Sequence, residues 1–229
     1  IEPIHLNLQK HRLSFLVVDT NTPHALAHNG FADRRAASES CAKALGLTFL
    51  RDALPEDLSC AHHDEREAKE WRLELVDSSV NRSLTALEER EGSATFPRGW
   101  VRHAFHDMTL VGRASYLLKH ADELGYRAFE EAGRIFTESF ISMRDELRVS
   151  RPEIDAAVEA YLAHGALGAR IVGGGFGGAV MALVKTSRLE ETAQAIAQAY
   201  AEHGYAEPRF LPMVAGFPAD CDWLSENFR

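Results

Sequence analysis

The sequence predicts an α+β fold, a sheet of about four mostly antiparallel strands that is covered by helices and has ferredoxin-like, split βαβ connections. Three observations lead to this prediction. Apolar runs with strand character stand near both ends of the 229-residue chain, the middle of the chain is helical, and a helical segment joins the last two strand-like runs. Strands separated from a block of helices in this way are typical of the α+β class.

Two runs near the N-terminus have strand character. Apolar and polar residues alternate over 4–9, and 13–19 (LSFLVVD) is a compact apolar run, so we predict a hairpin over both. Because Ile1 is not Met and the chain opens on the first predicted strand, we expect the sequence to be cut from a longer one. A loop over 20–30 and a helix over about 31–45 follow.

From residue 47 onward, helical spacing of apolar residues alternates with turn signals. Ser150 and Glu153 match a capping box, with Pro152 in the first turn, which predicts a helix that ends near 164. The predicted elements are a connector over 47–62, helices over 64–91, 100–124, 126–147 and about 150–164, strands over 169–172 and 179–184, a helix over 188–203 and a strand over 209–215.

Composition excludes several classes of function. A net charge of −9 argues against a nucleic-acid surface and against binding to an anionic membrane. Cys41, Cys60 and Cys221 are odd in number, far apart and without C-x-x-C spacing, which is typical of reduced cysteines rather than of a disulfide or zinc framework. The sequence contains no signal peptide and no apolar run long enough to span a bilayer, so we expect a cytoplasmic protein.

A glycine-rich stretch between two short apolar strands is the most informative local feature. It consists of Gly173, Gly174, Gly175, Phe176, Gly177 and Gly178. So many glycines predict a main chain that enters left-handed conformations or approaches another group closely. The stretch fits G-x-G-x-x-G, but a strand follows it instead of a helix, and no lysine completes a phosphate loop. A tight hairpin with surplus glycine remains an alternative.

Other candidate sites are weaker. His103 and His106 stand three apart on a predicted helix, a spacing that could hold a metal, but no third ligand has a recognisable spacing. We therefore expect these two histidines on the solvent side of the helix and predict no metal site. No local motif supports a Ser/His/Asp arrangement.

Three segments, in the same order, resemble the GHMP family of small-molecule kinases and, within it, the galactokinase branch. GARIVGGGFGGAVMALV resembles the family's third signature motif, and 19–35 and 138–155 resemble two further segments of the branch. The matching residues of these two segments are His24, Leu26, Ala27, Arg34, Arg35, Ser142, Arg144, Asp145, Val149, Ser150, Pro152 and Asp155.

The resemblance implies a sugar kinase that transfers the γ-phosphate of ATP to a sugar hydroxyl (C1 of galactose), with Mg²⁺ present. It implies that residues 1–229 are the C-terminal domain, with a divergent helical insertion over about 47–100. The sugar-binding motif, the phosphate loop and the catalytic residues would all belong to an N-terminal domain absent from this chain. We therefore expect no catalytic residue here, an inactive isolated chain, and a glycine hairpin over 173–178 that braces the phosphate loop.

Three residues depart from the pattern of the branch. Phe31 stands where a sugar-contacting Tyr is usual, Val172 replaces a Thr, and Phe140 replaces a His. Loss of a hydroxyl that reads the sugar would weaken binding by about 1 kcal/mol. Phe31 and Val172 thus keep open the alternative of a non-catalytic kinase-like module that binds sugar or regulates. A plain structural domain with a glycine hairpin is a third alternative.

Overall fold

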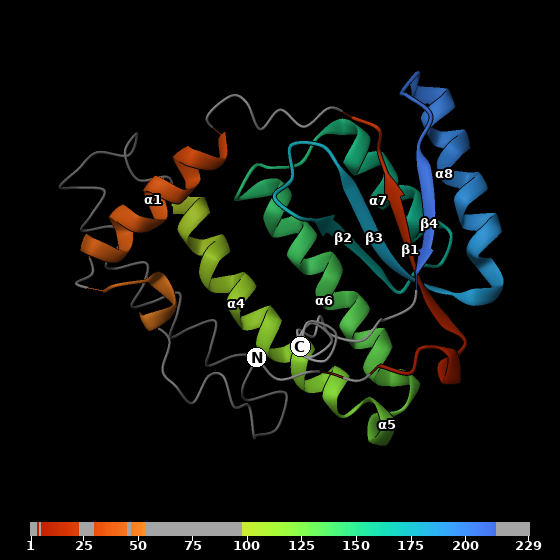
Figure 1. Cartoon of the computed structure of the whole chain (residues 1–229), viewed down its shortest axis with the longest axis horizontal. Helices are drawn as coiled ribbons and strands as arrows, with labels where there is room; N and C mark the ends of the chain where they lie inside the picture. The colour runs from red at the N-terminus through yellow and green to blue at the C-terminus, as the bar shows by residue number, and fades with distance from the viewer. Residues whose placement is uncertain (1–3, 5, 23–29, 45–46, 54–97, 214–229) are drawn as a thin grey trace, which may run out of the picture.

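The computed structural model describes residues 4, 6–22, 30–44, 47–53 and 98–213, and Figure 1 shows their arrangement. The helices of these ranges are η1 (Gln9–His11), α1 (Gly30–Ala44), η3 (Leu50–Ala53), α4 (Arg98–Lys119), α5 (Ala121–Leu124), α6 (Tyr126–Asp145), α7 (Pro152–Ala163), η6 (Thr186–Arg188) and α8 (Leu189–His203). The strands are β1 (Leu13–Asp19), β2 (Gly168–Val172), β3 (Ala179–Lys185) and β4 (Arg209–Met213).

The four strands form one antiparallel sheet in the order β2-β3-β1-β4. Strands β3 and β4 both pair with β1, so they run parallel to each other on either side of it and are joined by α8. Strands β1 and β2 are related to β3 in the same way. Two interleaved split βαβ units of this kind are the ferredoxin-like topology, so the predicted fold class is confirmed.

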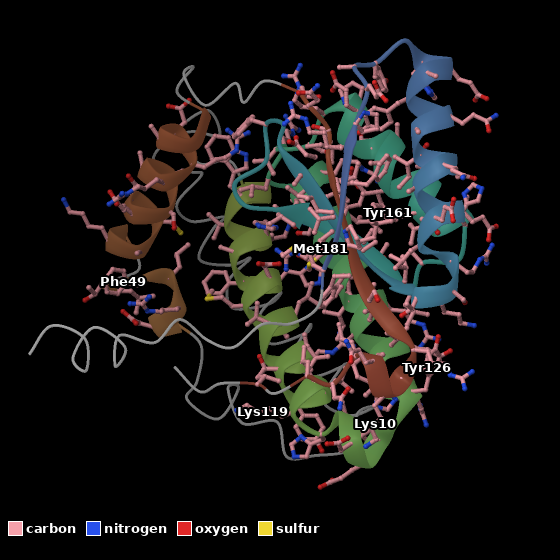
Figure 2. All side chains as sticks on the ribbon, turned by 45° about the vertical axis from the view of Figure 1, so that its right-hand side comes forward. Lys10, Phe49, Lys119, Tyr126, Tyr161 and Met181 are labelled. Atoms are coloured by element: carbon pink, nitrogen blue, oxygen red, sulfur yellow. The ribbon has the colours of Figure 1, made fainter. Side chains whose placement is uncertain are left out.

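Helices α7 and α8 pack together on one face of the sheet. Alternate strand residues such as Leu16 and Val18 point into this core, where their exposed fractions are 2% and 0%. Tyr161, labelled in Figure 2, extends from α7 to the sheet, and its buried hydroxyl donates a hydrogen bond to the backbone oxygen of Leu16 (2.8 Å). That bond satisfies a polar group which would be costly to bury alone.

A second block of helices adjoins the edge strand β2. Helix α6 contacts β2, α4 contacts α6, and α1 contacts α4, so the three helices follow one another away from the sheet (Figure 1). A Cβ atom on Gly168 of β2 would collide with the main chain of Gly133 on α6, and a Cβ atom on Gly133 would collide with the main chain of Leu167, directly before β2. This close helix–strand contact fixes the position of α6 against the sheet.

The predicted hairpin over 4–9 and 13–19 is wrong. Strand β1 already has β3 on one edge and β4 on the other, so no edge remains for a further strand. Leu8, which is 2% exposed, instead contributes to a core formed with α4 and α6, and η1 leads the chain into β1. The apolar residues that alternate over 4–9 therefore pack against helices and do not form a strand of the sheet.

The prediction of a capping box is also wrong, although the helix that it predicted is present as α7. Arg151 is the N-cap of α7 and makes no capping hydrogen bond with its side chain. The hydroxyl of Ser150 donates instead to a carboxylate oxygen of Asp155 (2.5 Å), while Pro152 opens the helix as predicted.

Most of the predicted insertion over 47–100, including the helix over 64–91, lies outside the described residues. Of its described part, Leu50 of η3 is buried against α1 and α4. In the described ranges, none of the helices has the length and apolar character needed to cross a membrane.

Candidate functional site

The glycine-rich segment joins β2 to β3, and most of its backbone is left-handed. Gly173, Gly175, Gly177 and Gly178 have φ values of 84°, 77°, 127° and 82°, and Phe176 between them has φ 62°. Such values are accessible to glycine at little cost but are strained for a residue with a bulky side chain. The left-handed backbone that the glycines predict is thus confirmed at four of the five glycines.

The tip of this hairpin packs against the turn that joins α6 to α7. The amide of Phe176 donates to the backbone oxygen of Val149 (2.7 Å). A Cβ atom on Gly175 would lie 2.5 Å from that same oxygen and 2.6 Å from the Cβ of Val149, so only glycine fits there. One close approach that the glycines predict is therefore made within this chain, at Gly175.

Thr20, directly after β1, fixes the other side of the hairpin. Its amide (2.9 Å) and its hydroxyl (2.7 Å) both donate to the backbone oxygen of Gly178. Thr20 is fully buried, so these two bonds are shielded from water. The segment that leaves β1 toward α1 is thereby tied to the glycine hairpin.

Arg34 of α1 connects the same hairpin to two further segments. Its guanidinium donates to the backbone oxygens of Leu147 (Nε, 2.7 Å) and Arg148 (Nη2, 2.8 Å). The same group lies 4.5 Å from the ring centre of Trp100 and 4.8 Å from that of Phe176. Burial lowers the pKa of Arg34 from its ordinary value, but an arginine side chain stays charged at any physiological pH.

The remaining part of the hairpin faces outward. Val172 is 44% exposed, Gly173 and Gly174 are exposed, and a Cβ atom on Gly173 would meet nothing. This rim offers an apolar side chain and accessible backbone. Such a surface allows another main chain or a ligand to approach closely.

Phe31, the residue predicted to contact a sugar, lies in the first turn of α1, three positions before Arg34. Its side chain lies outside what the structure describes, as do His24, Leu26 and Ala27 of the matching segment.

The two histidines of α4 are not on the solvent side as predicted. His103 is 8% exposed, and its Nδ1 lies 3.0 Å from the hydroxyl oxygen of Ser142, which donates to Glu146 (3.1 Å). The Nε2 of His106 lies 2.9 Å from a carboxylate oxygen of Glu138 on α6. Both histidines therefore face α6. The sequence did not show that α6 packs against this side of α4, so the side was expected to face solvent.

Burial and pairing move the pKa values of these histidines in opposite directions. Desolvation lowers the pKa of His103, although Asp107 and Glu146 oppose the shift. The hydrogen bond with Glu138 raises the pKa of His106, against the smaller effect of burial. No three His, Cys, Asp or Glu side chains gather to hold a metal ion anywhere in the described ranges.

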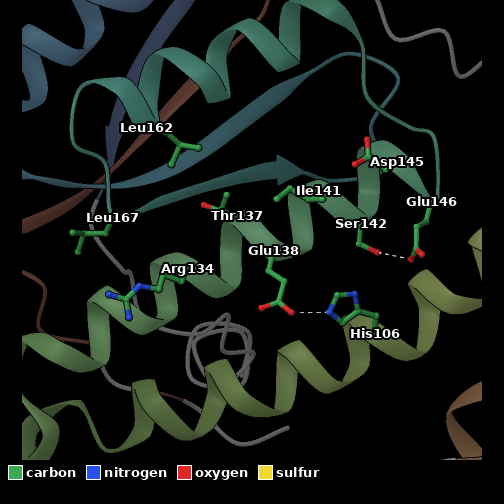
Figure 3. Close-up of a pocket in the computed structure, with 10 residues that line it drawn as sticks. All are labelled: His106, Arg134, Thr137, Glu138, Ile141, Ser142, Asp145, Glu146, Leu162 and Leu167. Atoms are coloured by element: carbon green, nitrogen blue, oxygen red, sulfur yellow. Dashed lines mark hydrogen bonds and ion pairs between the residues drawn. The ribbon is translucent and has the colours of Figure 1, made fainter. Parts of the chain in front are cut away.

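A pocket of about 620 Å³ lies beside these contacts, between α4, α6 and α7. Figure 3 shows the residues that line it. Its lining includes two hydrogen-bonded pairs, His106 with Glu138 and Ser142 with Glu146, and none of its lining residues comes from the hairpin. We place the candidate site at the glycine hairpin rather than at this pocket, because the hairpin gathers three segments that are distant in the sequence.

The fold and the hairpin define a class of protein. It is an α+β domain of ferredoxin-like topology, in which the glycine-rich hairpin between β2 and β3 contacts helix α1 from an earlier part of the chain. Comparison with known proteins then shows what the chain is similar to. Residues 102–206, slightly less than half of the chain, match the family model described as GHMP kinases C terminal. The resemblance seen in the sequence is thus confirmed.

The chain is similar to galactokinases over most of its length. It is 33% identical to the galactokinase of Streptomyces coelicolor over 211 residues, which cover 92% of this chain and 46% of that protein. It is 33% identical to the human galactokinase over 190 residues, which cover 82% of this chain and 40% of that protein. The chain thus spans about half the length of the curated relatives it matches.

A solved structure shares the fold. The crystal structure of Lactococcus lactis galactokinase complexed with galactose aligns with a TM-score of 0.60 at 21% identity, over 92% of this chain and 46% of that one. At this level of identity the likeness concerns the fold alone.

Proposed function

We propose that this chain is the C-terminal half of a galactokinase-like sugar kinase, which transfers the γ-phosphate of ATP to the C1 hydroxyl of galactose. In this reaction the γ-phosphorus forms a bond to the sugar oxygen and its bond to the bridging oxygen breaks, so that ADP leaves. The hydroxyl proton goes to a base that this chain does not supply. The relatives named above motivate both the reaction and the sugar.

One structural observation supports the proposal most directly, namely the hairpin with a packed tip and an open rim. Phe176 and Gly175 are held against Val149, whereas Gly173 and Gly174 are exposed. In the proposal this rim braces the phosphate loop of a preceding domain, because Gly173 and Gly174 lack Cβ atoms and let another backbone come close. Phosphoryl transfer depends on such positioning and on neutralising phosphate charge.

Roles in this proposal divide between the two halves of the protein. This chain contributes the hairpin over 173–178 and Phe31, which would pack against the sugar without a hydroxyl to read it. The proposal assigns Mg²⁺ to the other half of the protein, where the resemblance places the metal ligand. ATP would meet this chain at the hairpin rim, and its phosphates would be held mainly by the other half.

Phe31 and Val172 favour a second candidate function, a sugar-binding module that regulates without transferring phosphate. Val172 is 44% exposed at the rim, where the galactokinase branch has a threonine hydroxyl. A protein that binds sugar and regulates without transferring phosphate would tolerate both substitutions.

The test is steady-state release of ADP from ATP and galactose, measured for the complete gene product that contains these residues and for the 229-residue chain alone. We expect turnover by the complete product and none by the chain alone. Galactose binding in calorimetry without turnover by the complete product would favour the regulatory module. The absence of both galactose binding and turnover would overturn both proposals.

A further inference from the structure

Arg34 brings together three segments that are far apart in the sequence. It stands on α1, its hydrogen bonds reach the turn after α6, and its stacking contacts reach α4 and the tip of the glycine hairpin. The same turn also accepts a hydrogen bond from the hairpin, because the amide of Phe176 donates to the backbone oxygen of Val149. The guanidinium thus contacts Phe176 on the hairpin and the two residues that precede Val149 in the turn.

The geometry needs an arginine. Its planar fork donates in two directions at once, to Leu147 and to Arg148, while the same group lies close to the rings of Trp100 and Phe176. A lysine would keep the charge but would lose the fork and the planar face. Carbonyl oxygens take the place of the carboxylates that arginine usually binds, so the contact is a fixed clamp on the main chain.

The backbone held by this clamp is strained. Of the four non-glycine residues with positive φ in the described part of the chain, two are Arg148 (φ 56°) and Phe176 (φ 62°). Both contact Arg34, one through its carbonyl oxygen and the other through its ring. Left-handed conformations of bulky residues persist only where surrounding contacts enforce them, and they gather at functional sites.

We propose that Arg34 is a positioning residue, which holds the hairpin over 173–178 in a fixed relation to helix α1 and to Phe31 one turn earlier on that helix. This inference rests on the proposed function, in which the hairpin serves the phosphate side and Phe31 the sugar side of one reaction. Arg34 touches neither substrate in this proposal. It sets the relative position of the two parts that do.

The first test is amide hydrogen exchange, followed by NMR, on the full 229-residue chain. In R34Q we expect the amide of Phe176 to exchange about tenfold faster, because the two-carbonyl fork and both ring contacts are lost. R34K should give an intermediate rate. R35Q is the matched control, since the neighbouring Arg35 is exposed and pairs with Glu39 (2.8 Å) one turn along the helix.

The amide of Val180, in β3 beyond the hairpin, separates a local effect from a global one. An unchanged Val180 rate beside a faster Phe176 rate supports the clamp. An equal acceleration of both would overturn it, because R34Q would then loosen the whole domain. An unchanged Phe176 rate, or an equal response in R35Q, would overturn it as well.

Turnover by the complete gene product distinguishes failure of this inference from failure of the proposed function. We expect R34Q to lower kcat for galactose phosphorylation at least tenfold with a smaller change in the KM for ATP, and R35Q to leave both unchanged. A faster Phe176 exchange in a protein that never phosphorylates galactose would support the clamp and refute the kinase. Wild-type kcat in R34Q would refute the positioning role and leave the kinase standing.

Discussion

Gly175 and Gly173 lie two residues apart in one hairpin and share a left-handed backbone, but their surroundings differ. At Gly175 a methyl group would be 2.5 Å from the backbone oxygen of Val149, and at Gly173 it would meet nothing within 4 Å. We predict that Gly175→Ala lowers the free energy of unfolding by about 2–4 kcal/mol, because backbone strain adds to the collision. Urea denaturation of the chain measures this loss.

Gly173→Ala is the matched control for that substitution. It carries the same left-handed strain without a collision, so we expect a loss of only about 1–2 kcal/mol. Equal losses in the two variants would show that the contact with Val149 does not constrain the hairpin.

The glycines also show how far single residues can be interpreted from sequence. Their density predicted left-handed backbone and close approach, because no other residue tolerates both. The sequence did not distinguish Gly175 from Gly173, since the distinction depends on a turn at Val149 in another part of the chain. Arg34 was recognisable only as part of a family segment, and its clamp joins residues more than a hundred positions apart.

At the scale of elements, predictions succeeded where one face of an element faces the core. The helix predicted over 188–203 is α8, and the strands predicted over 169–172 and 179–184 are β2 and β3 with small changes at their ends. The apolar pattern over 4–9 failed, because burial against a helix and burial in a sheet leave the same alternation. Partners in the tertiary structure decide such cases.

The contact between α4 and α6 includes a histidine whose charge should stabilise the fold. The pKa of His106 is raised by Glu138, so this interaction stabilises the folded state fully below the ordinary histidine pKa of about 6.5 and is lost as the pH rises through the raised value. His103, whose pKa burial lowers, acts oppositely, since its protonation in the unfolded chain opposes folding below that pH.

We therefore predict that His106→Gln costs more stability in acid than in base. Relative to the wild type, its loss should be about 0.5–1 kcal/mol larger near pH 5.5 than near pH 8.5, a modest value because the Glu138 side chain is 41% exposed to screening solvent. Urea denaturation at the two pH values measures the difference. Burial, the largest cause of the lowered pKa of His103, is present in both proteins and cancels, and only the smaller contribution of the His106 charge is lost in the variant.

Glu138→Gln provides the control within the same pair. It should show a pH-dependent loss of the same sign, and the double variant should add little further pH dependence, because the same His106–Glu138 interaction is removed in each case. Glu138 also pairs with Arg113 (3.7 Å), and loss of that pair should cost the same at both pH values because Arg113 stays charged. A loss in His106→Gln that is equal at both pH values would mean that the pair does not form in solution.

At the scale of the whole molecule, the folding unit is larger than the segment that the family model covers. That segment is 102–206, yet β1, one of the two inner strands of the sheet, lies far earlier in the chain. Strand β4 pairs only with β1, within the described sheet, and β3 would lose one of its two neighbours without it. A domain defined by the matching residues alone would therefore lack its central strand.

We predict that a fragment over 98–213 does not fold by itself, and that a peptide over 6–22 restores folding when added. Leu13, Leu16 and Val18 of β1 are at most 2% exposed, and burying three such side chains contributes about 5–9 kcal/mol. That equals the whole stability of many domains, about 5–15 kcal/mol. Circular dichroism and thermal denaturation of the fragment, with and without the peptide, measure the effect.

The same peptide with Leu16→Asp is the control and should fail to restore folding, because its carboxylate would enter the core between the sheet and α7. A cooperative thermal transition in the fragment without any peptide would refute the prediction, since α6, α7 and α8 would then hold a sheet that lacks its middle strand.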